Sequence, residues 1–127
     1  MGAAHRSSPT HVLLVEDDPL ARRLSARLLR AEFRVTEAEC GDEALFALHR
    51  ERFDVVLTDY RMPAMTGIEL LEHTRVHEPH MRRVLMSAGN VPGLAGLCAS
   101  GIVQAFIRKP LQLARDASVL RGEAGGG

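Results

Sequence analysis

Short apolar runs recur along this chain with amphipathic stretches between them, and this alternation constrains the fold more than any other feature. The segment FRVTEA at 33–38 alternates apolar and polar residues, which indicates a half-exposed edge strand. Alternating strands and helices are typical of a parallel sheet whose strands are connected by helices. The remaining runs are HVLLV at 11–15, DVVLT at 54–58, RVLM at 83–86 and QAFI at 104–107. The sequence therefore predicts five strands.

The stretch after the first run has a strong helix start signal. Asp18 can cap a helix that begins at Pro19, because an aspartate side chain accepts from the free backbone amides of the first turn and proline suits the first position. Leu20, Leu24 and Leu28 then fall on one face of this helix. The pattern predicts an amphipathic helix here.

Four further helices are expected, beginning near Gly41, after Thr66, over 91–101 and over 111–120. In the helix after Thr66, Ile68, Leu71 and Val76 are expected to face inward. The segment 91–101 is the weakest helix, since each of its interior glycines costs about 1 kcal/mol relative to alanine.

Right-handed crossovers between five parallel strands give a three-layer α/β/α domain of the flavodoxin-like type, with strand order 2-1-3-4-5. We expect this domain over residues 11–121. Residues 1–10 are expected to form a disordered tail, and 122–127 a flexible glycine-rich tail or the start of a linker.

Composition excludes several functional classes. Lys+Arg and Asp+Glu are both 16, so no net charge draws the chain to nucleic acid or to an anionic membrane. No run approaches the roughly 18 apolar residues of a membrane span. Cys40 and Cys98 lie far apart and fit no metal-ligand spacing, which favours a reducing, cytoplasmic setting.

Reactive side chains follow four of the five predicted strands. Glu16 and Asp17 come directly after the first strand, Asp59 after the third, Ser87 after the fourth and Lys109 after the fifth. Because the carboxyl ends of parallel strands meet at one edge of a sheet, we expect these side chains to converge there.

Three carboxylates in one pocket repel one another and favour a bound cation. Carboxylates without nearby histidine or cysteine favour Mg²⁺ over zinc or copper. Lys109 is the only lysine beside fifteen arginines, which indicates a site that needs a compact positive charge, as phosphate binding does. A carboxylate nucleophile, a divalent ion, an ammonium and the Ser87 hydroxyl are the requirements of phosphoryl transfer to Asp59.

The chain resembles the receiver domain of two-component response regulators, of which chemotaxis receivers are examples, over residues 11 to about 120. The matching motifs are VLLVEDDP, DVVLTDYRMPAMTGIELL, SAG and FIRKP, in the expected order. The spacings are also similar to those of receivers: 42 residues from Asp17 to Asp59, 28 from Asp59 to Ser87 and 22 from Ser87 to Lys109.

This resemblance implies that Asp59 accepts a phosphoryl group from a phosphohistidine on a sensor histidine kinase or phosphotransfer protein. It also implies a Mg²⁺ site formed by Asp17, Asp59 and the backbone carbonyl of Arg61, with Glu16 acting through water. Lys109 and Ser87 are then expected to hold phosphate oxygens.

The family resemblance further implies a switch. The Ser87 hydroxyl moves toward the phosphoryl group, Phe106 turns inward, and the face formed by 91–101, 104–107 and 111–120 is remodelled for a downstream protein or effector domain. The Lys109-Pro110 peptide bond is expected to be cis.

Such a chain is a signalling switch that catalyses only its own phosphorylation and dephosphorylation. The main alternative is a receiver-like adaptor that binds partners without being phosphorylated. A hydrolase of the haloacid dehalogenase type is disfavoured because it needs a second aspartate two residues after the nucleophile, where this chain has Arg61.

Overall fold

The five predicted strands form one parallel sheet in the computed structural model, which describes residues 9–123. Their order is β2-β1-β3-β4-β5, as the sequence predicts, so β2 and β5 are the edge strands. The strands are β1 His11–Val15, β2 Arg34–Ala38, β3 Val55–Asp59, β4 Arg82–Ser87 and β5 Ala105–Arg108. The expected terminal tails lie mostly outside the described residues.

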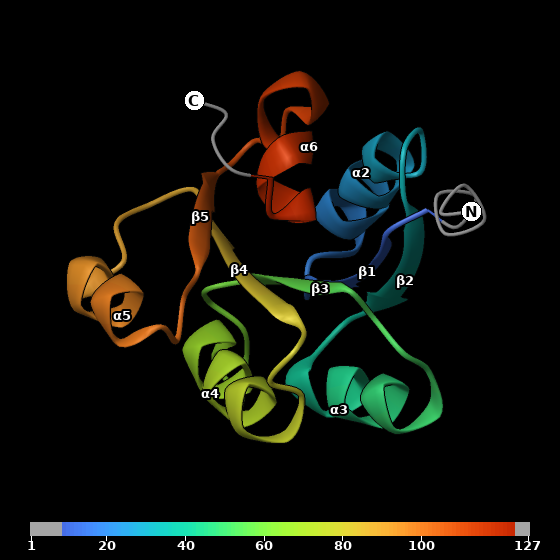
Figure 1. Cartoon of the computed structure of the whole chain (residues 1–127). Helices are drawn as coiled ribbons and strands as arrows, with labels where there is room; N and C mark the ends of the chain where they lie inside the picture. The colour runs from blue at the N-terminus through green and yellow to red at the C-terminus, as the bar shows by residue number, and fades with distance from the viewer. Residues whose placement is uncertain (1–8, 124–127) are drawn as a thin grey trace.

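Helices cover both faces of this sheet (Figure 1). On one face lie α2 and α6, and on the other lie α3, α4 and α5, so the architecture is the predicted three-layer α/β/α sandwich. The helices are α2 Pro19–Leu29, α3 Gly41–Arg50, α4 Gly67–His77, α5 Leu94–Ser100 and α6 Leu113–Arg121. Within residues 9–123 no helix has the length and apolar character needed to cross a membrane.

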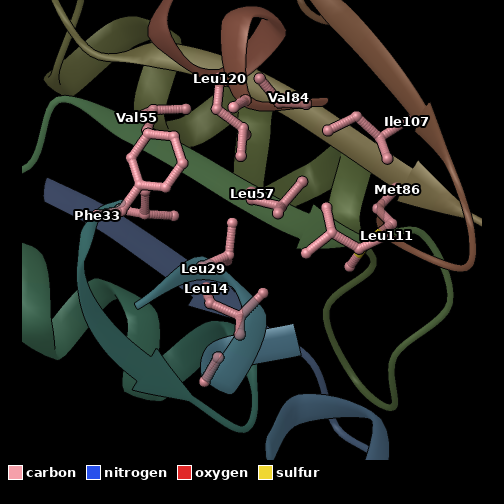
Figure 2. Packing of buried hydrophobic residues seen from close by; sticks show 13 residues of the cluster. Leu14, Leu29, Phe33, Val55, Leu57, Val84, Met86, Ile107, Leu111 and Leu120 are labelled. Carbon is pink, nitrogen blue, oxygen red and sulfur yellow. The ribbon is translucent and has the colours of Figure 1, made fainter. Parts of the chain in front are cut away.

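Two hydrophobic cores follow from the alternation of side chains along buried strands. In β1, Val12 and Leu14 belong to the core under α2 and α6, whereas Leu13 and Val15 belong to the core under α3, α4 and α5. Figure 2 shows the first core, in which Leu29 of α2 and Leu120 of α6 lie over the sheet. Burial on both faces explains why the central strands read as continuous apolar runs.

The helix start signals act as the sequence predicts. The Asp18 side chain accepts a hydrogen bond of 2.8 Å from the amide of Ala21, with Pro19 at the first helical position. At α4, Thr66 and Glu69 form a reciprocal capping box, in which each side chain accepts from the other's backbone amide. These caps fix where two helices begin, α2 after the loop that carries Asp17 and α4 after the loop that follows Asp59.

In α2 the predicted leucine face is not the face that packs on the sheet, and in α4 the predicted inward position of Val76 is wrong. Leu20, Leu24 and Leu28 are 63%, 54% and 45% exposed, because α2 rests on the sheet through Ala26 and Leu29. In α4, Val76 is 72% exposed, whereas Leu70 and Leu71 are fully buried. The apolar periodicity predicts that both segments are helical, but it does not predict which face of each helix packs on the sheet.

Candidate functional site

The ends of β1, β3 and β5 bring three charged side chains into direct contact. The Lys109 ammonium lies 2.6 Å from Glu16 Oε1 and 3.1 Å from Asp59 Oδ1. Glu16 and Asp59 are 1% and 8% exposed, so the charges meet in a largely desolvated pocket. The predicted convergence at the carboxyl edge of the sheet is present.

The three carboxylates converge as the ligands of a metal site do. Glu16, Asp17 and Asp59 each offer an oxygen, and the three oxygens lie within 4.8 Å of one another. Asp17 is the most open to solvent of the three, which leaves room for ligands from water. An all-oxygen donor set with water access fits Mg²⁺, which prefers carboxylates and retains part of its hydration shell.

The pKa values of this cluster reflect burial and close charges. Burial raises the pKa of Glu16, and the nearby Asp59 carboxylate raises it further, against the lowering effect of the Lys109 hydrogen bond and the Asp18 amide. Burial alone would lower the pKa of Lys109, but its hydrogen bonds to Glu16 and Asp59 outweigh this and raise it above 10.5. Lys109 therefore stays protonated at neutral pH.

The β1–α2 loop is held by interactions that the sequence did not reveal. The Asp18 amide donates to Glu16 Oε2 at 3.2 Å, and the Arg22 guanidinium donates to the Glu16 carbonyl at 2.9 Å. Arg22 also forms an ion pair of 3.3 Å with Glu37 of β2. No sequence signal marks Arg22, because its partner at the site is a backbone carbonyl.

The β3–α4 loop depends on a close backbone approach. The Thr58 hydroxyl donates to the Asp59 carbonyl at 3.0 Å, and the Gly67 amide donates to the Tyr60 carbonyl at 2.9 Å. A Cβ on Gly67 would lie 2.1 Å from the Asp59 carbonyl oxygen. Only glycine lets α4 begin this close to the end of β3.

The remaining predicted residues lie around this centre. Ser87 is 6% exposed, and its hydroxyl is engaged with the amide and carbonyl of Gly89, both at 3.2 Å. Phe106 is half-buried against the core under α3, α4 and α5. Arg61 lines an open pocket of about 370 Å³ together with Asp17. The Lys109-Pro110 bond is cis, as the resemblance implies.

The family model of the response regulator receiver domain matches residues 12–120. The chain therefore belongs to the response regulator receiver domain family, and both the fold and the position of the acidic cluster agree with this assignment.

Relatives in this family differ in length. The chain is 37% identical over 109 residues to the two-component response regulator ORR11 of Oryza sativa subsp. indica, covering 83% of this chain and 74% of that protein. It is 36% identical over 105 residues to the transcriptional regulatory protein GlrR of Escherichia coli K12, covering 81% of this chain. The chain spans only 23% of the length of GlrR.

Solved structures show the same fold. A CheY-like receiver domain protein from Methanospirillum hungatei JF-1 superimposes with a TM-score of 0.80 at 24% identity, covering 94% of this chain and all of that one. The receiver domain of sensor histidine kinase PA1611 from Pseudomonas aeruginosa PAO1 has a TM-score of 0.78 at 25% identity, covering 91% and 97%. The latter structure has a magnesium ion coordinated in its active-site cleft.

Gly67→Ala should destabilise the domain, because the new methyl group overlaps the Asp59 carbonyl. We expect a loss of about 2 kcal/mol in the free energy of unfolding, measured by urea denaturation. Gly96→Ala is the matched control, since a Cβ there meets nothing within 4 Å. It should be neutral or stabilise by up to about 1 kcal/mol. Equal effects of the two substitutions would contradict this account.

Lys109→Met should destabilise the metal-free protein by about 2 kcal/mol at neutral pH, because two buried carboxylates lose their cation. A lysine whose pKa is raised on folding stabilises fully below its unfolded pKa, and this contribution is lost as pH rises through the folded pKa.

The difference in unfolding free energy between wild type and Lys109→Met should therefore be constant below 10.5, the ordinary lysine pKa, and shrink above it. Urea denaturation in chelator from about pH 7 to about pH 11 measures this difference. A difference that grows in the alkaline range would contradict the proposed stabilisation.

Proposed function

We propose that this chain is a phospho-accepting receiver in which Asp59 takes a phosphoryl group from a phosphohistidine. The observation that carries the proposal is the Lys109 ammonium, 3.1 Å from Asp59 Oδ1 inside a cluster of three carboxylates. An adaptor that works by binding alone does not need this costly arrangement of desolvated charges.

In the proposed step, an Asp59 carboxylate oxygen attacks the phosphorus atom of the donor. The new P–O bond forms as the P–N bond breaks, and the electron pair returns to the histidine nitrogen. Lys109 binds a phosphoryl oxygen, and the Ser87 hydroxyl donates to another after leaving its Gly89 partners. The product is an aspartyl phosphate.

Mg²⁺ held by Asp17, Asp59 and the Arg61 carbonyl, with Glu16 acting through water, would supply charge neutralisation on the phosphoryl oxygens. The three converging oxygens support this assignment, as does the magnesium in the structurally similar PA1611 receiver domain. The chain's own contribution is positioning, because Glu16 also holds Lys109 in place at 2.6 Å.

Phosphorylation is proposed to act as a switch rather than as part of a metabolic cycle. Movement of Ser87 frees the backbone of the β4–α5 loop, and Phe106 on β5 turns inward as the loop shifts. The face made of α5, β5 and α6 then changes shape for a downstream protein or an effector domain. We place the folded domain at residues 11–121 and its action in the cytoplasm.

Incubation with Mg²⁺ and acetyl phosphate should add one phosphoryl group to the wild-type chain and none to Asp59→Asn, as read by intact mass. Asp18→Asn is the matched control, because asparagine retains the helix cap formed by this exposed side chain. Phosphorylation that survives in Asp59→Asn, or that is lost equally in Asp18→Asn, would refute Asp59 as the acceptor. An unmodified wild type would favour the adaptor.

We also propose that the phosphodonor protein docks on α2. Two of its exposed leucines, Leu24 and Leu28, line a mostly apolar groove of about 590 Å³, and Lys109 and Leu111 also belong to this lining. A donor histidine must come within bonding distance of Asp59, so the protein that carries it must cover the surface next to Lys109. The exposed leucines of α2 offer the apolar anchors that such a contact needs.

Leu24→Ala should slow phosphoryl transfer from a phosphohistidine protein roughly tenfold, since it removes a central apolar contact. The donor is selected from a panel of autophosphorylated kinases by transfer to the wild type. The rate with acetyl phosphate should not change. Phe46→Ala is the matched control, because Phe46 is 62% exposed but lies on α3, across the sheet. Equal slowing by both variants would refute docking on α2.

A further inference from the structure

Lys109 must reach two carboxylates from the end of an edge strand, and its backbone needs support there. β5 has a neighbouring strand on one side only and ends at Arg108. The Lys109 amide donates to the Ser87 carbonyl at 3.0 Å, which is the last ladder bond of this pair. Beyond it, the chain is fixed by the buried Leu111 side chain, two residues on.

The Arg115 guanidinium binds the backbone on both sides of Lys109, near the Lys109 amide bond to Ser87 and the buried Leu111. Its Nη2 donates to the Arg108 carbonyl at 2.7 Å and to the Pro110 carbonyl at 3.2 Å. These two carbonyls flank Lys109 on either side. Arg115 therefore fixes the peptide group that precedes Lys109 and the peptide group that follows Pro110, on either side of the residue whose ammonium contacts Asp59.

Arg115 is itself held in place by Asp116. Nε and Nη2 of Arg115 donate to the two oxygens of the Asp116 carboxylate at 2.7 and 2.9 Å, a bidentate pair that fixes the plane of the guanidinium. Asp116 is 3% exposed and also accepts from the Gln112 amide at 2.9 Å, at the start of α6. The Arg115 side chain is thereby fixed to the first turn of α6, a helix that packs on the core.

The geometry points to Arg115, oriented by Asp116, as a positioning residue for Lys109 in phosphoryl transfer. This role rests on the proposed function of Lys109 at the site, and Arg115 itself does not touch the reacting atoms. Without the Arg115 side chain, the carbonyls of Arg108 and Pro110 bond to water, and the loop that carries Lys109 becomes more mobile. A loosened ammonium binds the phosphoryl oxygens less well, because small misplacements at such sites have large effects on rate and affinity.

The chain offers a direct probe of this role, because Lys109 is its only lysine. Protein labelled with ¹⁵N-lysine gives a single lysine amide signal. In Arg115→Ala without Mg²⁺, the exchange of this amide with solvent should rise roughly tenfold, since the loop opens more often.

Arg121→Ala is the matched control. Arg121 lies on the same helix, pairs with Glu32 and is similarly exposed, but it is remote from the Lys109 loop. A merely structural role of Arg115 would lower global stability as Arg121→Ala does and leave the lysine signal unchanged.

The functional readout is the affinity for beryllofluoride, a mimic of the phosphoryl group, in saturating Mg²⁺. The dissociation constant should rise roughly tenfold in Arg115→Ala, while the affinity for Mg²⁺ alone changes less than about twofold. Arg121→Ala should match the wild type in both.

The possible outcomes separate the two proposals. If Arg115→Ala leaves both the lysine exchange and the beryllofluoride affinity equal to those of Arg121→Ala, the positioning role is overturned. If the wild type binds no beryllofluoride, the proposed function fails, and lysine exchange alone then decides whether Arg115 holds the loop.

Discussion

The contact of one ammonium with two buried carboxylates is the constraint on which the rest of this structure depends. Two unit charges 4 Å apart repel by about 4 kcal/mol at an effective dielectric constant near 20, so Glu16 and Asp59 could not share a pocket unaided. Lys109 offsets this repulsion at 2.6 and 3.1 Å. Because the three residues end three different strands, the contact also requires those strands to finish in register.

Backbone contacts keep this charged centre in its geometry. Arg22 binds the Glu16 carbonyl, Gly67 lets α4 start against the Asp59 carbonyl, and Arg115 binds the carbonyls on either side of Lys109. Each loop that carries a charged residue is thus fixed by a side chain or a glycine from the following helix. Residues of this kind add no chemistry, but they reduce the number of positions open to the reacting groups.

The sequence predicted the positions of the charged residues better than the packing of the helices. Parallel strands bring their carboxyl ends to one edge, so placing Glu16, Asp59 and Lys109 together required only the strand assignments. The faces of α2 and α4 were harder, because apolar periodicity marks a face without saying whether the sheet or another surface covers it. Leu24 and Val76 fit the period of a buried stripe and are nevertheless exposed.

The supporting residues escaped prediction for a different reason. Arg22 and Arg115 act on backbone carbonyls, which every residue carries, so no pattern of residue types marks such a pair. The chain has fifteen arginines, so composition does not single out Arg22 and Arg115. The orientation of the Ser87 hydroxyl toward Gly89 is likewise a property of the local backbone and has no sequence signal.

The surfaces formed by α2 and by α5 differ in how firmly their helices are held. α2 is firmly capped and exposes large leucines beside Lys109, as a rigid docking surface requires. By contrast, α5 has seven residues, none of them buried, and lies between Gly93 and Gly101, both in the left-handed conformation. A short helix with so little buried surface opens at low cost. The proposed phosphorylation of Asp59 would therefore need to supply only a small free energy, through Ser87 and the loop that follows it, to change the α5 face.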